Sequence, residues 1–152
     1  MNKYEYSLLA KCIALGNLSN WYAEEMPEDF AIPCIYFPPA VAAPGTHSLN
    51  AYEGRKVIYA KIFARTRRQA GEIAETISDG LMKGKRIVPV LKADTGKESG
   101  ETFKIGEPLT NVIEDGVAQI TLSYRLYQKY TEDAATKIQN LNLNEYLKNN
   151  RR

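Results

Sequence analysis

A long run of alternating residues from Val117 to Tyr130 constrains the fold of this chain more than any other feature. One set of side chains in the run is apolar and the other is polar. This period of two is typical of a strand that buries one face, and the turn dipeptide Asp115-Gly116 precedes it. The apolar set is Ala118, Ile120, Leu122, Tyr124 and Leu126, and the polar set is Gln119, Thr121, Ser123 and Arg125.

The predicted strand is unusually long. At roughly 3.3 Å per residue it would extend about 45 Å, more than twice the commonest strand length. A small monomer has little core to lay against such a strand, so its excess length and polar face indicate a surface used in assembly. The predicted oligomer interface consists of Gln119, Thr121, Ser123, Arg125 and Tyr127.

The composition predicts a single domain over residues 1–152. Hydrophobic residues make up 44% of the chain and charged residues 25%, which is the balance of a domain that buries its own core. The formal net charge is +2, from 20 basic and 18 acidic side chains. This balance argues against binding to nucleic acid or to a membrane surface through bulk charge alone.

The two cysteines and the single histidine offer no metal or cofactor site. Cys12 and Cys34 match no metal-binding or redox spacing, and His47 is the only histidine that could join them. The sequence therefore predicts two buried, reduced thiols and no cofactor. The N-terminus carries charge where a signal peptide needs an apolar core, and no apolar run approaches the roughly 20 residues that span a bilayer. We expect a soluble, intracellular protein with no membrane partner.

The first part of the chain predicts one helix and two strands. Apolar spacing indicates a helix over 3–15, and 17–31 are expected to form a connector. The apolar run 32–37 predicts a strand that is either an edge or begins after its proline. Prolines and glycines predict a long loop over 38–54, and 55–64 read as a central strand covered on both faces.

A second helix is predicted after Thr66, with Gln69 completing a capping box and Gly84 closing the helix. A strand over 86–92 should be an edge or contain a bulge because it holds Pro89. The helix should bury Ala70, Ile73, Ala74, Ile77 and Leu81.

The remaining residues predict a mobile polar loop over 93–100, a short strand over 102–105 and a hairpin that pairs 110–113 with the long strand. Residues 131–152 are predicted to be a C-terminal helix or arm, because the alternation of Asn and Leu over 140–144 fits an extended segment as well as a helix. The order of elements predicts an α+β fold with a mixed, mostly antiparallel sheet flanked by helices and a long hairpin strand.

No catalytic arrangement can be assembled from these residues. His47 has no nucleophile elbow or orienting carboxylate near it in sequence, and Asp94 to Lys97 lacks the glycine and the helix of a phosphate loop. We therefore expect no enzymatic activity.

Two basic clusters mark the two ends of the second predicted helix. A solvated helix face explains them most simply, and a small nucleic-acid-binding module that uses 65–68 and 83–86 is the alternative. The clusters are Arg65, Arg67 and Arg68 at one end and Lys83, Lys85 and Arg86 at the other.

Three segments carry a resemblance to a known family. They are Ile-Pro-Cys-Ile-Tyr-Phe-Pro at 32–38, Val-Ile-Tyr-Ala-Lys-Ile-Phe-Ala-Arg-Thr at 57–66, and Asp-Gly-Val-Ala-Gln-Ile-Thr-Leu-Ser-Tyr at 115–124. With the leading helix and this order of elements, the chain resembles the tail terminator, or tail completion, proteins of long-tailed bacteriophages and their prophage relatives. The likeness covers most of 32–130.

The resemblance implies a minor structural protein that caps the growing tail tube as a ring, commonly a hexamer, and joins the tail to the head. It implies tail tube and head–tail connector proteins as partners, assembly in the host cytoplasm and a place at the head–tail junction of the virion. Repeated around a ring, the two basic clusters could face the lumen and contact DNA weakly and without sequence preference.

Overall fold

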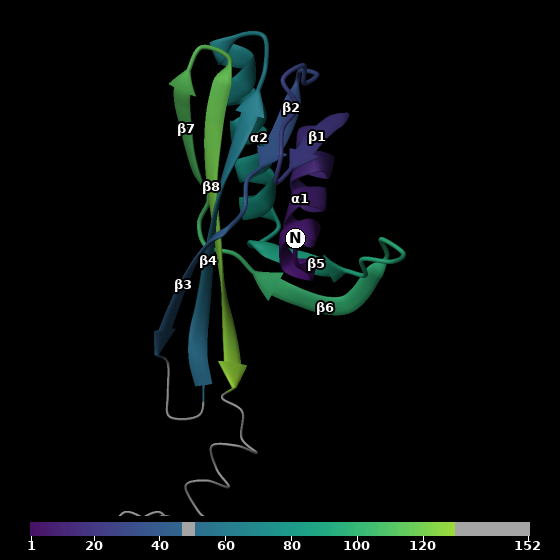
Figure 1. Cartoon of the computed structure of the whole chain (residues 1–152), viewed down its shortest axis with the longest axis vertical. Coiled ribbons are helices and arrows are strands. Elements are labelled where there is room, and N and C mark those ends of the chain that lie inside the picture. Colours follow the sequence, from purple (N-terminus) through teal and green to yellow (C-terminus); the bar gives the residue numbers. More distant parts are fainter. Residues whose placement is uncertain (47–50, 130–152) are drawn as a thin grey trace, which may run out of the picture. The chain divides into compact units, whose positions relative to one another are not determined.

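The computed structural model describes residues 1–46 and 51–129, and it describes side chains for 1–42 and 53–126 (Figure 1). The chain divides into two compact units, one formed by 1–42 and 56–125 and the other by 43–55 and 126–152. Two helices and a mostly antiparallel mixed sheet confirm the predicted α+β class. The prediction of a single domain stays a prediction, and the predicted helix or arm over 131–152 lies outside the described residues.

Both helices begin at polar caps. Helix α1 (Lys3–Gly16) starts with a complete capping box, in which Asn2 and Glu5 exchange side-chain and backbone hydrogen bonds. Helix α2 (Arg67–Lys83) has the predicted cap, because the Thr66 hydroxyl accepts a hydrogen bond from the Gln69 backbone N–H. The Gln69 side chain accepts from the Arg65 amide, one residue before the cap, so the predicted box is half formed.

The main sheet has the strand order β1-β2-β4-β8-β7, and β3 pairs with β4 beside this path. Strands β1 and β2 are parallel, whereas β2 with β4 and β7 with β8 are antiparallel. The strands are β1 (Asn20–Ala23), β2 (Cys34–Phe37), β3 (Val41–Thr46), β4 (Ala51–Phe63), β7 (Leu109–Glu114) and β8 (Val117–Lys129).

A second sheet consists of β5 (Ile87–Leu91) and β6 (Glu98–Lys104), which pair antiparallel with a register shift after Pro89. This confirms the predicted edge strand with a proline. The Leu91 backbone amide donates to the Ser7 hydroxyl at 2.8 Å, so a buried serine of α1 satisfies this backbone N–H of β5.

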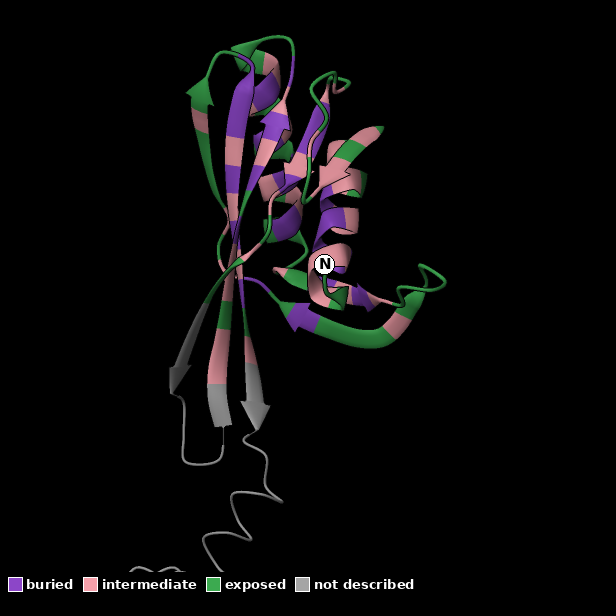
Figure 2. Cartoon of the chain, in the orientation of Figure 1, coloured by how far each residue is buried: buried purple, intermediate pink, exposed green. Residues whose placement is uncertain are grey.

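The core lies between the helices and one face of the main sheet. The predicted inward sets of β4 and β8 are buried except Leu126, which is half-buried, and Tyr59 on the other face of β4 is 43% exposed. Figure 2 shows the buried stretches of both strands. The prediction that β4 is covered on both faces is therefore wrong for the described chain, because both helices pack on a single side. The fully buried large side chains include Phe37, Ile58, Ile62, Ile77, Ile120, Leu122 and Tyr124.

Three further predictions need correction. The connector 17–31 contains β1, so β2 is an inner strand and not an edge. The other predicted alternative is confirmed, because β2 begins after Pro33. The predicted loop 38–54 contains β3 and the start of β4, while 47–50 lie outside the described residues. The predicted loop 93–100 ends earlier, because β6 begins at Glu98. A proline and a glycine in β3 suggested a loop, but a strand that pairs on one side tolerates proline.

Candidate assembly surface

The polar face of β8 lies on the side of the main sheet that the helices leave uncovered. Gln119, Thr121 and Ser123 are half-buried and Arg125 is exposed, while the alternate residues from Ala118 to Tyr124 are buried. The predicted alternation is confirmed over this stretch. The side chain of Tyr127, the fifth predicted interface residue, lies outside the described side chains.

Strand β7 continues this surface to the edge of the sheet. Leu109 lies opposite Thr121, and Asn111 lies opposite Gln119, so these side chains share one face. Leu109 is 67% exposed, and Ile113, at a register shift in the hairpin, is 47% exposed. Nearly all of β7 is exposed in Figure 2. We call Leu109, Asn111, Ile113, Gln119, Thr121, Ser123 and Arg125 the outer hairpin surface.

The sequence missed the apolar part of this surface. Ile113 ends the short segment 110–113 that the sequence predicts only to pair with the long strand, and Leu109 lies just before that segment. Regular pairing from the Asp115-Gly116 turn would place Leu109 opposite the buried Leu122, and only the register shift between Val112 and Glu114 places it beside Thr121. The sequence pattern alone therefore could not have assigned Leu109 to this face. Two exposed apolar side chains next to a half-buried polar row are typical of a protein–protein contact surface.

Two of the three arginines in the first basic cluster form ion pairs within the chain. Arg67 lies 3.9 Å from the Asp115 carboxylate in the hairpin turn, and Arg68 pairs with Glu72 one helical turn away at 3.0 Å. The Arg65 backbone amide donates to Gln69, and its side chain is exposed. Such exposed ion pairs contribute little stability, but they reduce the positive charge that this end of α2 presents.

The second basic cluster lies at the other end of α2. Lys83 and Lys85 are exposed, whereas Arg86 is half-buried and its guanidinium donates to the Ile105 carbonyl at 3.4 Å. At about 1.5 Å per residue, α2 separates the two clusters by roughly 24 Å. The structure therefore does not bring the six predicted basic residues together in one copy.

Both cysteines are buried and free. Burial raises the pKa of the Cys12 thiol to about 12 and that of Cys34 to about 11, although a hydrogen bond from the Phe63 backbone lowers the Cys34 value slightly. Within the described residues, no group of three or more His, Cys, Asp or Glu side chains could hold a metal ion. No helix in that part of the chain has the length and apolarity needed to cross a membrane.

The buried thiol of Cys12 predicts a loss of stability at high pH. Its ordinary pKa of 9.0 applies to the unfolded chain, so between pH 9 and about 12 the unfolded state loses a proton that the folded state keeps. At pH 10 this should cost about 1.4 kcal/mol. Urea unfolding at pH 8 and pH 10 measures the effect, and Cys12→Ala should show a correspondingly smaller drop. Equal drops in both proteins would contradict the assignment.

Comparison with known proteins gives relatives from Bacillus subtilis (strain 168). "Uncharacterized protein YqbJ" is 32% identical over 103 residues, covering 68% of this chain and 70% of YqbJ. "Phage-like element PBSX protein XkdJ" is 22% identical over 127 residues, covering 84% of this chain and 86% of XkdJ.

A chain in the solved structure "Virion of native gene transfer agent (GTA) particle" aligns with 83% of this chain and 94% of its own length, at a TM-score of 0.45 and 12% identity. No model of a known protein family matches. The identity to YqbJ and the share of both chains that it covers establish the relationship: this chain belongs to the same family as YqbJ of Bacillus subtilis.

Proposed function

We propose that this chain is a non-enzymatic phage structural protein that caps the tail tube as a ring and joins the tail to the head. The outer hairpin surface carries the proposal, because it combines exposed apolar side chains with a half-buried polar row on a sheet face that neither of the two described helices covers. The relative XkdJ, named as a protein of a phage-like element, supports a role in a phage particle. Such a protein would assemble in the host cytoplasm and remain at the head–tail junction.

A ring of more than two copies requires a contact other than the symmetric one that ends at a dimer. A head-to-tail contact uses two different patches of each copy, and it forms a closed ring when the rotation between neighbours completes a circle. The main sheet has two different edges, β1 and β7, so a contact that starts at the outer hairpin surface can meet a different part of the next copy. A hexamer is the ring size we propose, with tail tube and connector proteins on its two faces.

The solution mass tests the ring directly. We expect a concentration-dependent shift from monomer to a closed multimer in light scattering, in the isolated protein or after addition of tail tube protein. Arg125→Glu should weaken the contact by several kcal/mol, because reversing a charge in a buried contact leaves it without a suitable partner. Lys92→Glu, at an exposed site beyond β5, is the matched control. A monomeric mass at every concentration, with and without tube protein, would refute the ring.

We further propose that the ring turns the two basic clusters toward its lumen, where DNA passes. The clusters are Arg65, Arg67, Arg68, Lys83, Lys85 and Arg86.

DNA binding by the assembled protein should then be weak and strongly dependent on salt. Each phosphate that a basic side chain neutralises contributes a slope of about −0.9 in log affinity against log salt. Titration of two unrelated duplexes at about 50 and 200 mM salt should give equal affinities that fall sharply at the higher salt. A preference for one duplex, or affinity that survives the higher salt, would favour a nucleic-acid-binding module instead.

A further inference from the structure

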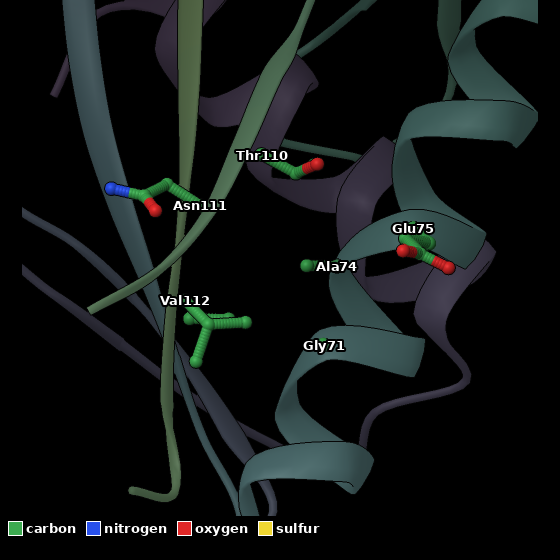
Figure 3. A pocket seen from close by; sticks show the side chains of 7 residues that line it. Gly71, Ala74, Glu75, Thr110, Asn111 and Val112 are labelled. Carbon is green, nitrogen blue, oxygen red and sulfur yellow. The ribbon is translucent and has the colours of Figure 1, made fainter. Parts of the chain in front are cut away.

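A pocket lies at the open edge of the main sheet, between α2 and strand β7. Its volume is about 120 Å³, and it is lined by Gly71, Ala74 and Glu75 of α2 and by Thr110, Asn111 and Val112 of β7. Figure 3 shows Thr110 and Val112 pointing toward the helix, Ala74 pointing toward the strands and Asn111 pointing away. A cavity of about 150 Å³ can admit a benzene molecule, so this open pocket, which Glu75 and Thr110 make partly polar, has room for one branched aliphatic side chain.

Strand β7, which lines the pocket, is an edge strand in the described part of the chain. β7 is the last strand of the main sheet, and its pairing with β8 uses only one of the two edges of β7. It carries no lysine or proline between Leu109 and Glu114, although such residues commonly protect edges against pairing. A strand added there would lie about 4.8 Å from β7, and alternate side chains of it would enter the space under α2.

The chain itself contains a segment with the pattern that this site requires. Residues 130–152 follow β8, and Gln-Asn-Leu-Asn-Leu-Asn over 139–144 places Leu141 and Leu143 two positions apart. In an extended conformation both leucines would project to one side and the asparagines to the other. Residues 130–139 would span at most roughly 35 Å when extended, so 139–144 could lie up to that distance from Lys129.

We propose that 139–144 of one copy add as a strand to the β7 edge of the next copy in the ring, with Leu141 or Leu143 in the pocket beside Ala74. This inference rests on the proposed self-association and names the segment that would stabilise the contact between copies. Gly71 has no side chain and Ala74 only a methyl group, which leaves room for the incoming leucine. The asparagines of the added strand would then lie on the opposite face, beside Asn111. The outer hairpin surface remains available on the other face of the sheet.

Disulfide crosslinking between full-length copies tests the exchange. One tagged copy carries Thr110→Cys and a differently tagged copy carries Leu141→Cys or Leu143→Cys, and the two are mixed and oxidised. The native thiols should not interfere, because Cys12 and Cys34 are buried. We expect a disulfide-linked heterodimer with at least one of the two leucine positions. Asn142→Cys, on the opposite side of the same segment, is the matched control and should give at least fivefold less product.

A second variant fills the pocket. Ala74→Leu should occupy the pocket, reduce the crosslink several-fold and leave far-ultraviolet circular dichroism unchanged. A multimeric mass without crosslinking from either leucine would overturn the exchange and leave the ring intact, whereas a monomeric mass without crosslinking would refute both. An intramolecular disulfide in the Thr110→Cys/Leu143→Cys protein at monomer mass would show that the segment covers its own edge, and it would also overturn the exchange between copies.

Discussion

Replacing Leu109 and Ile113 together by aspartate should convert the assembled protein into folded monomers. Both side chains are exposed in the isolated chain, so their replacement should change its stability by no more than about 0.5 kcal/mol each. In an assembled ring they would be buried, and an unpaired carboxylate in a buried contact is strongly unfavourable. We expect the dissociation constant between copies to rise at least a thousandfold, which corresponds to about 4 kcal/mol.

Sedimentation or light scattering over a range of concentrations measures this change, and urea unfolding confirms that each copy still folds. The matched control is Met82→Asp/Ile87→Asp, which places the same charges on two exposed apolar side chains at 46% and 45% exposure away from the hairpin. An assembly that tolerates both pairs of substitutions equally would show that the outer hairpin surface is not the contact.

The sequence predicted the parts of this fold that follow from a short-range pattern. The period of two in β8 and the apolar stripe of α2 are local consequences of burial on one face, and the structure buries the same residues, except that Ile73 and Leu126 are half-buried. The Thr66 cap and the Gly116 turn are set by side-chain and backbone chemistry within a few residues.

The missed elements depend on long-range pairing. β1 is short and lacks alternation, so only its pairing with β2 makes it a strand. β3 contains Pro44 and Gly45, which are unfavourable in strands, and it is a strand because it pairs with β4. The same limit applies to the outer hairpin surface, because a register shift between Val112 and Glu114 decides which face Leu109 occupies. It also applies to the pocket, which joins α2 to β7 across more than thirty positions of sequence, a distance over which no periodicity carries information.

The turn between β7 and β8 should tolerate no side chain at Gly116. This glycine has φ +75°, which is unfavourable for residues with a Cβ, and an added Cβ would lie 2.6 Å from the Ala64 carbonyl oxygen. The Gly116 carbonyl also accepts the Ala64 amide at 2.9 Å, so the turn cannot move away without losing a hydrogen bond between neighbouring strands. We expect Gly116→Ala to lower the free energy of unfolding by about 3 kcal/mol, from backbone strain and overpacking together.

Gly100→Ala separates the two contributions to this loss. Gly100 has φ +90°, but an added Cβ there would meet no atom within 4 Å, so only the backbone strain of roughly 1–2 kcal/mol should appear. Urea unfolding of both variants gives the difference directly. A loss at Gly116 no larger than that at Gly100 would show that the approach to Ala64 relaxes freely. A clear excess would establish that this contact fixes the β7–β8 hairpin against β4, and with it the position of the outer hairpin surface that the proposed ring requires.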